Sequence, residues 1–401
     1  MVMKIVYVNF KFLDEGGRSE YIFQLAKGLS QKGHFIYIVS SDELTGIPLN
    51  KNRLKNLKNV KFIGLPAVPT SVPSRRFFIP DLAKTLLGLK VDIIHAHGIS
   101  DLTTQMAILS ARVKNVPLVV STYFHPCWAY REKQDYLMWK AMHEVFGKTA
   151  CIESKRIICT SKEEKSDIQK AFFNIPLNGK LAVIEPGVDF SQFENPTLED
   201  SLIKKFNLPG NRRFILILAD LKNPRKGLYE VIKIVNEVRK VIPSVYLLAC
   251  GSWPEYDFSY KTKQVSPLIK RLKMNPNMSI LGPVTISEKA GLFKMAEVFL
   301  SPTIYESFGI ALTEALYNNV PVVATKIGGT QTVITNKKDG FLINGSDSTN
   351  DFSQKVIFLL QNKEKALKMG EFGHKKVCRN FSWEKTVEKT EKLYEKLLPL
   401  Q

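Results

Sequence analysis

The sequence predicts an α/β protein made of two domains, each built around a parallel β-sheet. Short apolar runs alternate with segments of helical periodicity, which is the pattern of successive strand–helix units. The alternation stops near residue 184, gives way to a polar, irregular stretch up to residue 210, and starts again with an apolar strand at residues 213–219. A chain of 401 residues is too long for one ordinary core, so we expect a domain boundary in the polar stretch.

Composition limits the class of protein. There is no apolar run of about eighteen residues that would span a membrane. The five cysteines are scattered and lack any Cys-x-x-Cys spacing, which argues against a disulfide framework or a zinc ribbon and predicts a cytoplasmic location. The formal charge of +19 suits an anionic substrate or an anionic membrane surface. Because no nucleic-acid-binding motif stands out, no nucleic-acid partner is expected.

The first half of the chain predicts a regular series of strands and helices. Strands are expected at residues 4–10, 34–40, 91–98, 117–125, 156–160 and 181–184, and helices at residues 17–33, 101–113, 134–150 and 162–170. The turn between the first strand and the first helix carries Gly16 and Gly17. A glycine pair in this position is either a tight turn or a place where the backbone approaches a phosphate or a sugar.

A basic segment follows the second strand. Residues 51–61 contain five lysine or arginine residues and no acid, and Leu54 and Leu57 fall at helical spacing. We expect an amphipathic helix that is either a solvated surface helix or a helix lying on an anionic membrane. The irregular, basic and aromatic loop at residues 69–80 would adjoin it.

Histidines lie at the ends of two expected strands. His95 and His97 fall on the same side of the strand at residues 91–98, with His95 expected to be partly packed and His97 to lie at the mouth of the sheet. His125 closes the next strand, so both strands would deliver a histidine to one rim. These histidines are either structural or functional. Metal binding is disfavoured because no third ligand lies nearby at a recognisable spacing.

The second half repeats the strand–helix pattern. Strands are expected at residues 213–219, 244–250, 278–281, 298–300 and 321–324, and helices at residues 227–240, 310–317 and 382–398. The turn after the first of these strands carries Arg225 and Lys226 immediately before a helix. Two cations in this position suit a diphosphate, because their N–H groups form charge-assisted hydrogen bonds with phosphate oxygens.

Two carboxylates flank the start of a helix within residues 296–329. Glu306 lies in the loop after an apolar strand, and Glu314 lies eight residues later on the helix, about 12 Å further along if the whole stretch were helical. In parallel sheets such a helix start binds anions. The pair is either two solvated helix-end charges or a set of acceptors for the hydroxyl-rich ends of a sugar–diphosphate–nucleoside.

The sequence resembles the retaining glycosyltransferases of family four, which have the GT-B fold of two Rossmann-like domains facing across a cleft. The resemblance extends over nearly the whole chain and rests on the order and spacing of its motifs. These motifs are Gly16-Gly17, His97, residues 183–189, Arg225-Lys226-Gly227, Glu306 to Glu314, Gly328-Gly329 and Phe381-Ser382-Trp383.

The resemblance implies transfer of a sugar, with retention, from a nucleotide diphosphate sugar to a hydroxyl group of a glycan or lipid-linked acceptor. No cofactor is expected, and no metal ion is required because no Asp-x-Asp motif is present. The alternative is a non-catalytic GT-B protein that binds a nucleotide or a glycan as a partner. The resemblance implies that residues 191–381 bind the donor and that residues 1–190 bind the acceptor. The helix at about 382–401 is expected to dock on residues 1–190. A peripheral location on the inner face of the membrane is compatible with this assignment.

The resemblance also assigns roles to individual residues. Glu306 would lie near the donor sugar hydroxyls, and Glu314 would hold the ribose. Lys226 would pair with the phosphates, and the backbone of Phe308, Gly309 and Ile310 would contact the sugar or diphosphate. His97 would contact the transferred sugar. Gly16 and Gly17 would lie near the diphosphate and acceptor.

Two positions depart from the family pattern. Asp220 stands where the family usually has an arginine, and its repulsion from a diphosphate at about 4 Å would cost roughly 4 kcal/mol at an effective dielectric constant of 20. We expect Arg225 to supply the missing charge and Asp220 to turn away. The family's Gly-x-Gly-Pro-Glu motif is represented by residues 251–255, in which Trp253 either stacks on the base or packs against the protein.

Overall fold

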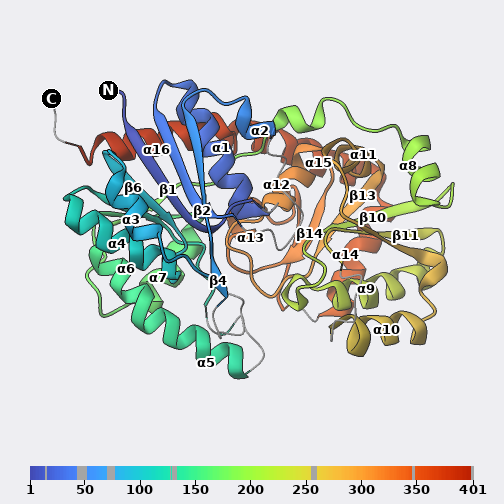
Figure 1. The fold of residues 1–401 in the computed structure, drawn as a ribbon. Helices are drawn as coiled ribbons and strands as arrows, with labels where there is room; N and C mark the ends of the chain where they lie inside the picture. The colour runs from blue at the N-terminus through green and yellow to red at the C-terminus, as the bar shows by residue number, and fades with distance from the viewer. Residues whose placement is uncertain are drawn as a thin grey trace. The chain divides into compact units, whose positions relative to one another are not determined.

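The structure divides the chain into two units, each with its own sheet. It is a computed structural model that describes residues 1–13, 16–42, 52–69, 77–126, 128, 133–253, 260–345 and 348–398. The first unit comprises Met1–Gly187 together with Trp383–Gln401, and the second comprises Val188–Ser382. Figure 1 shows both units with their strands in the centre and helices on either side. Within the described residues, no helix has both the length and the apolar character needed to cross a membrane.

The first unit contains a seven-stranded parallel sheet with the order β3-β2-β1-β6-β7-β8-β9. Its strands are β1 (Lys4–Lys11), β2 (Phe35–Ser41), β3 (Val60–Leu65), β6 (Ile93–His97), β7 (Leu118–Ser121), β8 (Arg156–Cys159) and β9 (Leu181–Val183). A short antiparallel pair joins β4 (Val68–Pro69) to β5 (Phe77–Phe78). The order of the strands reverses between β1 and β6, and ligands bind in parallel sheets at such a reversal.

Helices cover both faces of this sheet. They are α1 (Gly17–Gln31), α2 (Asn52–Lys55), α3 (Leu82–Gly88), α4 (Leu102–Lys114), α5 (Lys133–Met142), α6 (Lys148–Glu153), α7 (Lys162–Ala171) and α16 (Trp383–Glu395), with a π-helical segment at His143–Gly147. Strand residues alternate between the faces, so Val6 and Val8 pack on one core while Ile5 and Tyr7 pack on the other. The second core is closed by α1 and α16, which come from opposite ends of the chain.

Close packing of α1 against α16 depends on a glycine. A Cβ atom on Gly28 of α1 would lie 2.3 Å from a methyl group of Val387 on α16. Protein interiors are packed too densely to absorb such an overlap cheaply. The C-terminal helix is therefore an integral part of the first unit.

The second unit contains a six-stranded parallel sheet with the order β12-β11-β10-β13-β14-β15. Its strands are β10 (Arg213–Leu218), β11 (Val245–Cys250), β12 (Met278–Gly282), β13 (Ala296–Ser301), β14 (Val322–Thr325) and β15 (Gly340–Ile343). Its helices are α8 (Glu199–Phe206), α9 (Leu228–Val241), α10 (Ser266–Arg271), α11 (Ile286–Met295), α12 (Ile310–Tyr317), α13 (Thr330–Val333), α14 (Thr349–Gln361) and α15 (Lys363–Asn380). Phe214 and Leu216 face one apolar core, and Ile215 and Ile217 face the other.

The predicted helix at residues 51–61 is wrong. Only α2, a single turn, is helical, and the chain enters β3 at Val60, which pairs with Ile36 of β2. Arg53 forms an ion pair with Glu20 of α1 at 3.0 Å and lies 3.9 Å from the centre of the Phe23 ring. The apolar residues whose spacing indicated a helix pack against the core beside β2. The pairing of β3 with β2 fixes the end of this segment. Lys51 and residues 70–76 of the adjoining loop lie outside the described residues.

The polar stretch at residues 185–210 is more regular than predicted. It contains the 3-10 helix Phe190–Phe193 and α8, whose residue Leu202 is fully buried in the second unit. The helix is short and its outer face is charged, so its sequence resembles that of a linker. Burial of one apolar stripe against α11 is what makes it part of the unit.

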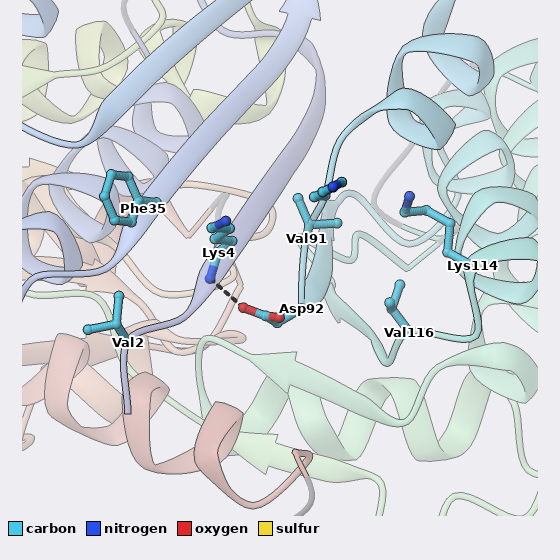
Figure 2. A pocket seen from close by; sticks show the side chains of 8 residues that line it. Val2, Lys4, Phe35, Val91, Asp92, Lys114 and Val116 are labelled. Atoms are coloured by element: carbon cyan, nitrogen blue, oxygen red, sulfur yellow. Dashed lines mark hydrogen bonds between the residues drawn. The ribbon is translucent and has the colours of Figure 1, made fainter. Parts of the chain in front are cut away.

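A hollow of about 540 Å³ opens at the amino ends of β1 and β6 (Figure 2). Lys4 and Asp92 line it, and the backbone N–H of Lys4 donates to Asp92 at 2.7 Å. The hollow contains none of the residues that the sequence predicts to be functional. In parallel sheets the ligand site is expected at the opposite, carboxyl edge of the strands.

Candidate functional site

The turn after β10 is fixed by its own sequence. The side-chain oxygen of Asn223 accepts a hydrogen bond from the N–H of Arg225 at 3.1 Å, and Pro224 takes the first position of the 3-10 helix Pro224–Lys226. Gly227 ends the turn with a left-handed φ of 79°, where a side chain would collide with the loop after β13. The turn therefore presents two consecutive cations at a defined position.

Lys226 reaches from this turn to Glu306. Its Nζ lies 2.7 Å from Glu306 Oε2, and both side chains are partly buried. Because β10 and β13 are neighbours, the loops that follow them meet at one edge of the sheet. The carbonyl oxygen of Arg225 joins the loops further by accepting hydrogen bonds from Ile304 N–H at 2.9 Å and from the Thr303 hydroxyl at 3.0 Å.

The loop that carries Glu306 is supported from below by a glycine. Gly329 donates its N–H to the Glu306 carbonyl at 2.7 Å, and a Cβ atom on Gly329 would lie 2.4 Å from Phe308 Cα. Gly309 caps α12 with a left-handed φ of 106°. The Phe308 side chain points into the core, where its ring meets that of Phe381 at 5.4 Å, so the backbone is what this loop presents.

Replacing Gly329 by alanine is expected to lower the free energy of unfolding by about 1–3 kcal/mol and to weaken nucleotide binding, because the added methyl group would displace the loop backbone. Urea unfolding and titration calorimetry measure the two effects. Gly210→Ala is a matched control, since a Cβ atom there would meet nothing within 4 Å. Equal stability and affinity for the two variants would contradict the supporting role of Gly329.

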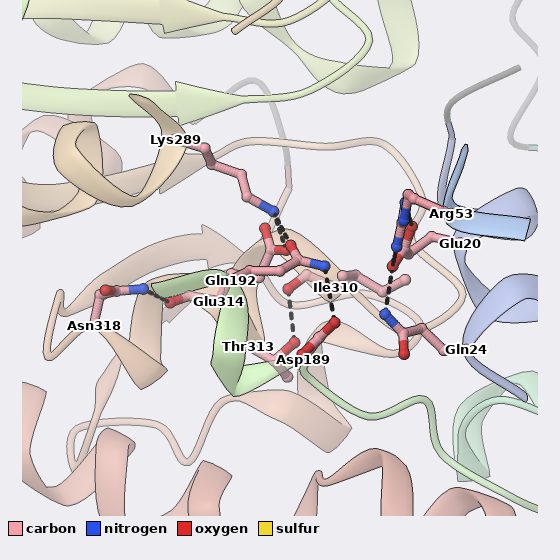
Figure 3. Close-up of polar contacts among 10 residues, drawn as sticks. All are labelled: Glu20, Gln24, Arg53, Asp189, Gln192, Lys289, Ile310, Thr313, Glu314 and Asn318. Carbon is pink, nitrogen blue, oxygen red and sulfur yellow. Dashed lines mark hydrogen bonds and ion pairs between the residues drawn. The ribbon is translucent and has the colours of Figure 1, made fainter. Parts of the chain in front are cut away.

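Glu314 forms the second carboxylate–lysine pair of this unit (Figure 3). Its Oε1 lies 2.6 Å from Nζ of Lys289 on α11, which also contacts Gln192 Oε1 at 3.0 Å. Only 10% of the Glu314 side chain and 17% of the Lys289 side chain are exposed. Glu306 and Glu314 are therefore not simply solvated helix-end charges. No local pattern singles out Lys289, because its partner Glu314 lies on another helix, 25 residues further along the chain.

The two departures from the family pattern lie in the loops after β10 and β11. The carboxylate of Asp220 accepts a hydrogen bond from the Ser252 hydroxyl, so its charge is partly satisfied within the protein. The ring of Trp253 packs partly against the apolar core and has the Lys261 ammonium 5.9 Å from its centre. Pro254 and Glu255, which complete the motif, lie outside the described residues.

In the first unit, His97 lies at the carboxyl end of β6, and its side chain is fully buried there. Its ring stacks on that of His95 at 4.2 Å, and its Nδ1 lies 3.3 Å from the Tyr123 hydroxyl. Within the described residues, Nε2 of His97 has no hydrogen-bond partner. Burial, with smaller contributions from His95 and Arg18, lowers the pKa of His97 well below its usual value, so the imidazole is neutral.

His95 is completely packed rather than partly packed. Its Nδ1 lies 2.6 Å from the Tyr394 hydroxyl of α16, and its Nε2 lies 2.8 Å from the Ser121 hydroxyl. Burial lowers the pKa of His95 to about 3. His95 therefore links the C-terminal helix to the strands that carry His97.

His125 does not end a strand beside His97, contrary to the prediction. β7 ends at Ser121, which is paired with His97, and His125 lies four residues further on, where its carbonyl group bonds to His143 at 3.0 Å. The chain leaves the sheet because the buried carboxylate of Glu164 accepts the N–H of Phe124 at 2.7 Å. This turn gives Tyr123, rather than His125, the position next to His97, with a left-handed φ of 43°.

Arg18, which directly follows the glycine pair, connects this turn to His97. The sequence pattern does not single out Arg18. Gly16 is extended, Gly17 begins α1, and the Arg18 guanidinium donates to Asp101 at 2.6 Å and to the His97 carbonyl at 3.4 Å. The same guanidinium lies 4.8 Å from the centre of the Tyr123 ring. Asp14 and Glu15, just before the pair, lie outside the described residues.

Two families of proteins match the chain, one in each unit. The family described as "Glycosyltransferase Family 4" matches residues 15–192, and that described as "Glycosyl transferases group 1" matches residues 199–376. The D-inositol 3-phosphate glycosyltransferase of Corynebacterium urealyticum is 25% identical over 403 residues, which cover 96% of this chain and 91% of the relative. An Escherichia coli enzyme named UDP-Gal:alpha-D-GlcNAc-diphosphoundecaprenol alpha-1,3-galactosyltransferase is 26% identical over 80% of this chain and 83% of its own.

A third relative matches only in part. The trehalose synthase of Thermococcus litoralis is 29% identical over 217 residues, so this match spans about half the length of that relative and 52% of this chain. Among solved structures, a glycosyltransferase from Rickettsia africae ESF-5 superposes with a TM-score of 0.78 at 21% identity, with all of both chains covered. Anabaena HepE in complex with UDP and glucose gives a TM-score of 0.77 at 17% identity, covering 98% of this chain and 100% of HepE. The predicted fold of two parallel-sheet domains is thereby confirmed.

Proposed function

Because this chain belongs to the family-four glycosyltransferases, which have the GT-B fold, we propose that it transfers a sugar from a nucleotide diphosphate sugar to a hydroxyl group of a glycan or lipid-linked acceptor. The observation that supports the proposal best is the pair of carboxylate–lysine contacts, Lys226–Glu306 and Lys289–Glu314, within one donor unit. The proposal includes retention at the transferred carbon and a reaction without a metal ion. Within the described residues, no group of three metal-ligating side chains lies together.

Lys226 and Glu306 suggest how the donor would be bound. The lysine and the carboxylate pair with each other. A diphosphate carries more negative charge than one carboxylate, so we propose that Lys226 bonds to it and that Glu306 then accepts hydrogen bonds from the sugar hydroxyls. The cation would stabilise the charge that develops on the leaving diphosphate. The start of α12, with its free backbone N–H groups, would add to this stabilisation.

His97 is proposed to contact the transferred sugar as a neutral group. Its lowered pKa means that it carries no charge at neutral pH, so its contribution is a directed hydrogen bond from the imidazole rather than proton donation by an imidazolium. The contact from the Tyr123 hydroxyl to Nδ1 leaves Nε2 as the ring atom for this bond. Gly16 and Gly17, joined to the same region through Arg18, are proposed to lie near the diphosphate and acceptor.

Replacing Arg225 by alanine is expected to weaken binding of the donor nucleotide by about tenfold or more. Arg225 is proposed to supply the positive charge that is missing because Asp220 stands where the family usually has an arginine. Isothermal titration with UDP, GDP and ADP measures the effect. Arg271→Ala is the control, since Arg271 is exposed on α10 of the same unit. If Arg225→Ala retained wild-type affinity and turnover, the proposed compensation would be wrong.

The second candidate function is that of a non-catalytic nucleotide- or glycan-binding partner. Asp220, in place of the usual phosphate-binding arginine, is the observation that favours it. Thermal-shift measurements with UDP, GDP and ADP, followed by hydrolysis assays with the corresponding sugar donors, distinguish the candidates. Donor hydrolysis supports the transferase, whereas tight nucleotide binding without any turnover supports the partner protein.

We also propose that this protein is cytoplasmic and binds the anionic inner face of the membrane. The formal charge of +19 and the exposed Lys55, Lys58 and Lys61 favour such a surface. Arg53 is engaged with Glu20 and contributes less. Sedimentation with anionic and neutral liposomes at low salt tests the proposal, and equal binding to both would remove its support.

A further inference from the structure

Lys289 is largely buried in the second unit, with 17% of its side chain exposed, although neither the sequence pattern nor the proposed reaction assigns it a role. Its ammonium group contacts Glu314 Oε1 at 2.6 Å and Gln192 Oε1 at 3.0 Å, and it lies 5.3 Å from the centre of the Phe193 ring (Figure 3). A lysine ammonium is rarely buried to this extent, because its removal from water must be offset by specific partners. Here the partners come from α12 and from the 3-10 helix Phe190–Phe193.

The contact with Lys289 makes the two oxygens of the Glu314 carboxylate unequal. Oε1 is taken by the ammonium group, whereas Oε2 has no hydrogen-bond partner within the part of the chain that the structure describes. The backbone of Glu314 is fixed as well, because its carbonyl accepts the Asn318 side-chain amide at 2.8 Å. These contacts favour one orientation of the carboxylate. In that orientation Oε2 keeps its full acceptor capacity, whereas Oε1 keeps only part of its own.

We infer that Lys289 is a positioning residue that makes Glu314 bind the two hydroxyl groups of the donor ribose unequally. The inference rests on the proposed function, because the ribose belongs to the nucleotide of the donor. A freely rotating carboxylate would accept hydrogen bonds from both vicinal hydroxyls and would distinguish them little. Because the ammonium group already uses part of the acceptor capacity of Oε1, loss of the hydroxyl bound to Oε2 leaves a partly buried acceptor unpaired and costs more than loss of the other hydroxyl.

The experiment compares nucleotides that differ by one hydroxyl group. Titration calorimetry first identifies which of UDP, GDP and ADP binds the wild-type protein most tightly, and the 2′-deoxy and 3′-deoxy forms of that nucleotide are then measured. We expect one deoxy form to bind at least about tenfold more weakly than the parent and the other to bind within about threefold of it.

The variants test whether Lys289 causes this difference. Lys289→Met is expected to reduce the ratio of the two deoxy-form dissociation constants to about twofold or less, and Lys289→Gln provides a second removal of the charge. Lys289→Arg keeps a cation near Glu314 and is expected to retain the ratio. Lys294→Met is the matched control, because Lys294 is exposed on the same helix. Circular dichroism confirms that each variant is folded.

The outcomes separate this inference from the proposed function. Collapse of the ratio in Lys289→Met or Lys289→Gln, with retention in Lys294→Met, supports the positioning role. A wild-type protein that binds a nucleotide but treats both deoxy forms alike overturns the inference alone, as does a charge-removing variant that keeps the wild-type ratio. A wild-type protein that binds none of the three nucleotides overturns the proposed function together with the inference.

Discussion

Replacing Lys226 by methionine is expected to lower kcat for sugar transfer by about 100- to 1000-fold, with a smaller change in protein stability. Lys226 is the cation proposed to face the leaving diphosphate, and loss of one group that stabilises developing charge typically has this magnitude. Methionine keeps the length and apolar character of the chain, so the effect reports the charge. Steady-state kinetics with the donor identified by thermal shift measure the change.

The control for this variant is Lys222→Met. Lys222 is an exposed lysine four residues earlier in the same connection, so both substitutions remove one positive charge from the same region. Lys222→Met is expected to keep kcat within about twofold of wild type, since surface charges at a distance are screened by salt. Equal losses in the two variants would mean that a general electrostatic attraction, and not the contact at Glu306, determines the rate.

Acidification from pH 7 to pH 5 is expected to destabilise the first unit by roughly 2 kcal/mol through His95, and His97 is expected to act in the same direction. Burial lowers the pKa of His95 to about 3 and that of His97 well below its usual value. The unfolded chain then binds protons below pH about 6.5 that the folded chain does not bind. The stability contributed by the neutral rings is complete above that pH and is lost as the pH falls toward the folded-state values.

Urea unfolding of the wild type and of His95→Gln at pH 7 and pH 5 measures this effect. The variant is expected to be less stable at pH 7, because the Tyr394 hydroxyl loses its partner, but to lose less stability on acidification. His374→Gln, on α15 of the second unit, is the control with the histidine cluster intact. If His95→Gln lost as much stability as the wild type between the two pH values, proton uptake by His95 would not be the cause.

Much of the second unit is predictable from the sequence because its signals are local. The apolar run before Glu306, the turn residues around Arg225 and Lys226, and the helix that carries Glu314 are each recognisable within a few residues. The rule that parallel strands place their carboxyl ends at one edge then brings Lys226 to Glu306. The resemblance to a family adds the order of these units, and the comparisons confirm the fold that it implies.

The remaining features depend on contacts between residues far apart in the sequence. The helix predicted at residues 51–61 is limited to the single turn of α2, because from Val60 onward the chain pairs with β2 as strand β3. Tyr123 replaces His125 next to His97 because a buried carboxylate from α7 turns the chain. Lys289 cannot be predicted from local sequence for the same reason, since its contact is with Glu314 on α12.

The contact between Tyr394 and His95 has a consequence for synthesis of the protein. The ribosome makes the second unit before it makes α16, so the first unit, whose sheet begins at Lys4, lacks this helix until the whole of the second unit has been made. Until then the face of the sheet that carries Ile5 and Tyr7 is incompletely covered. We therefore expect a nascent chain that ends before Trp383 to expose apolar surface and to bind chaperones, although it already contains every residue of both predicted binding regions.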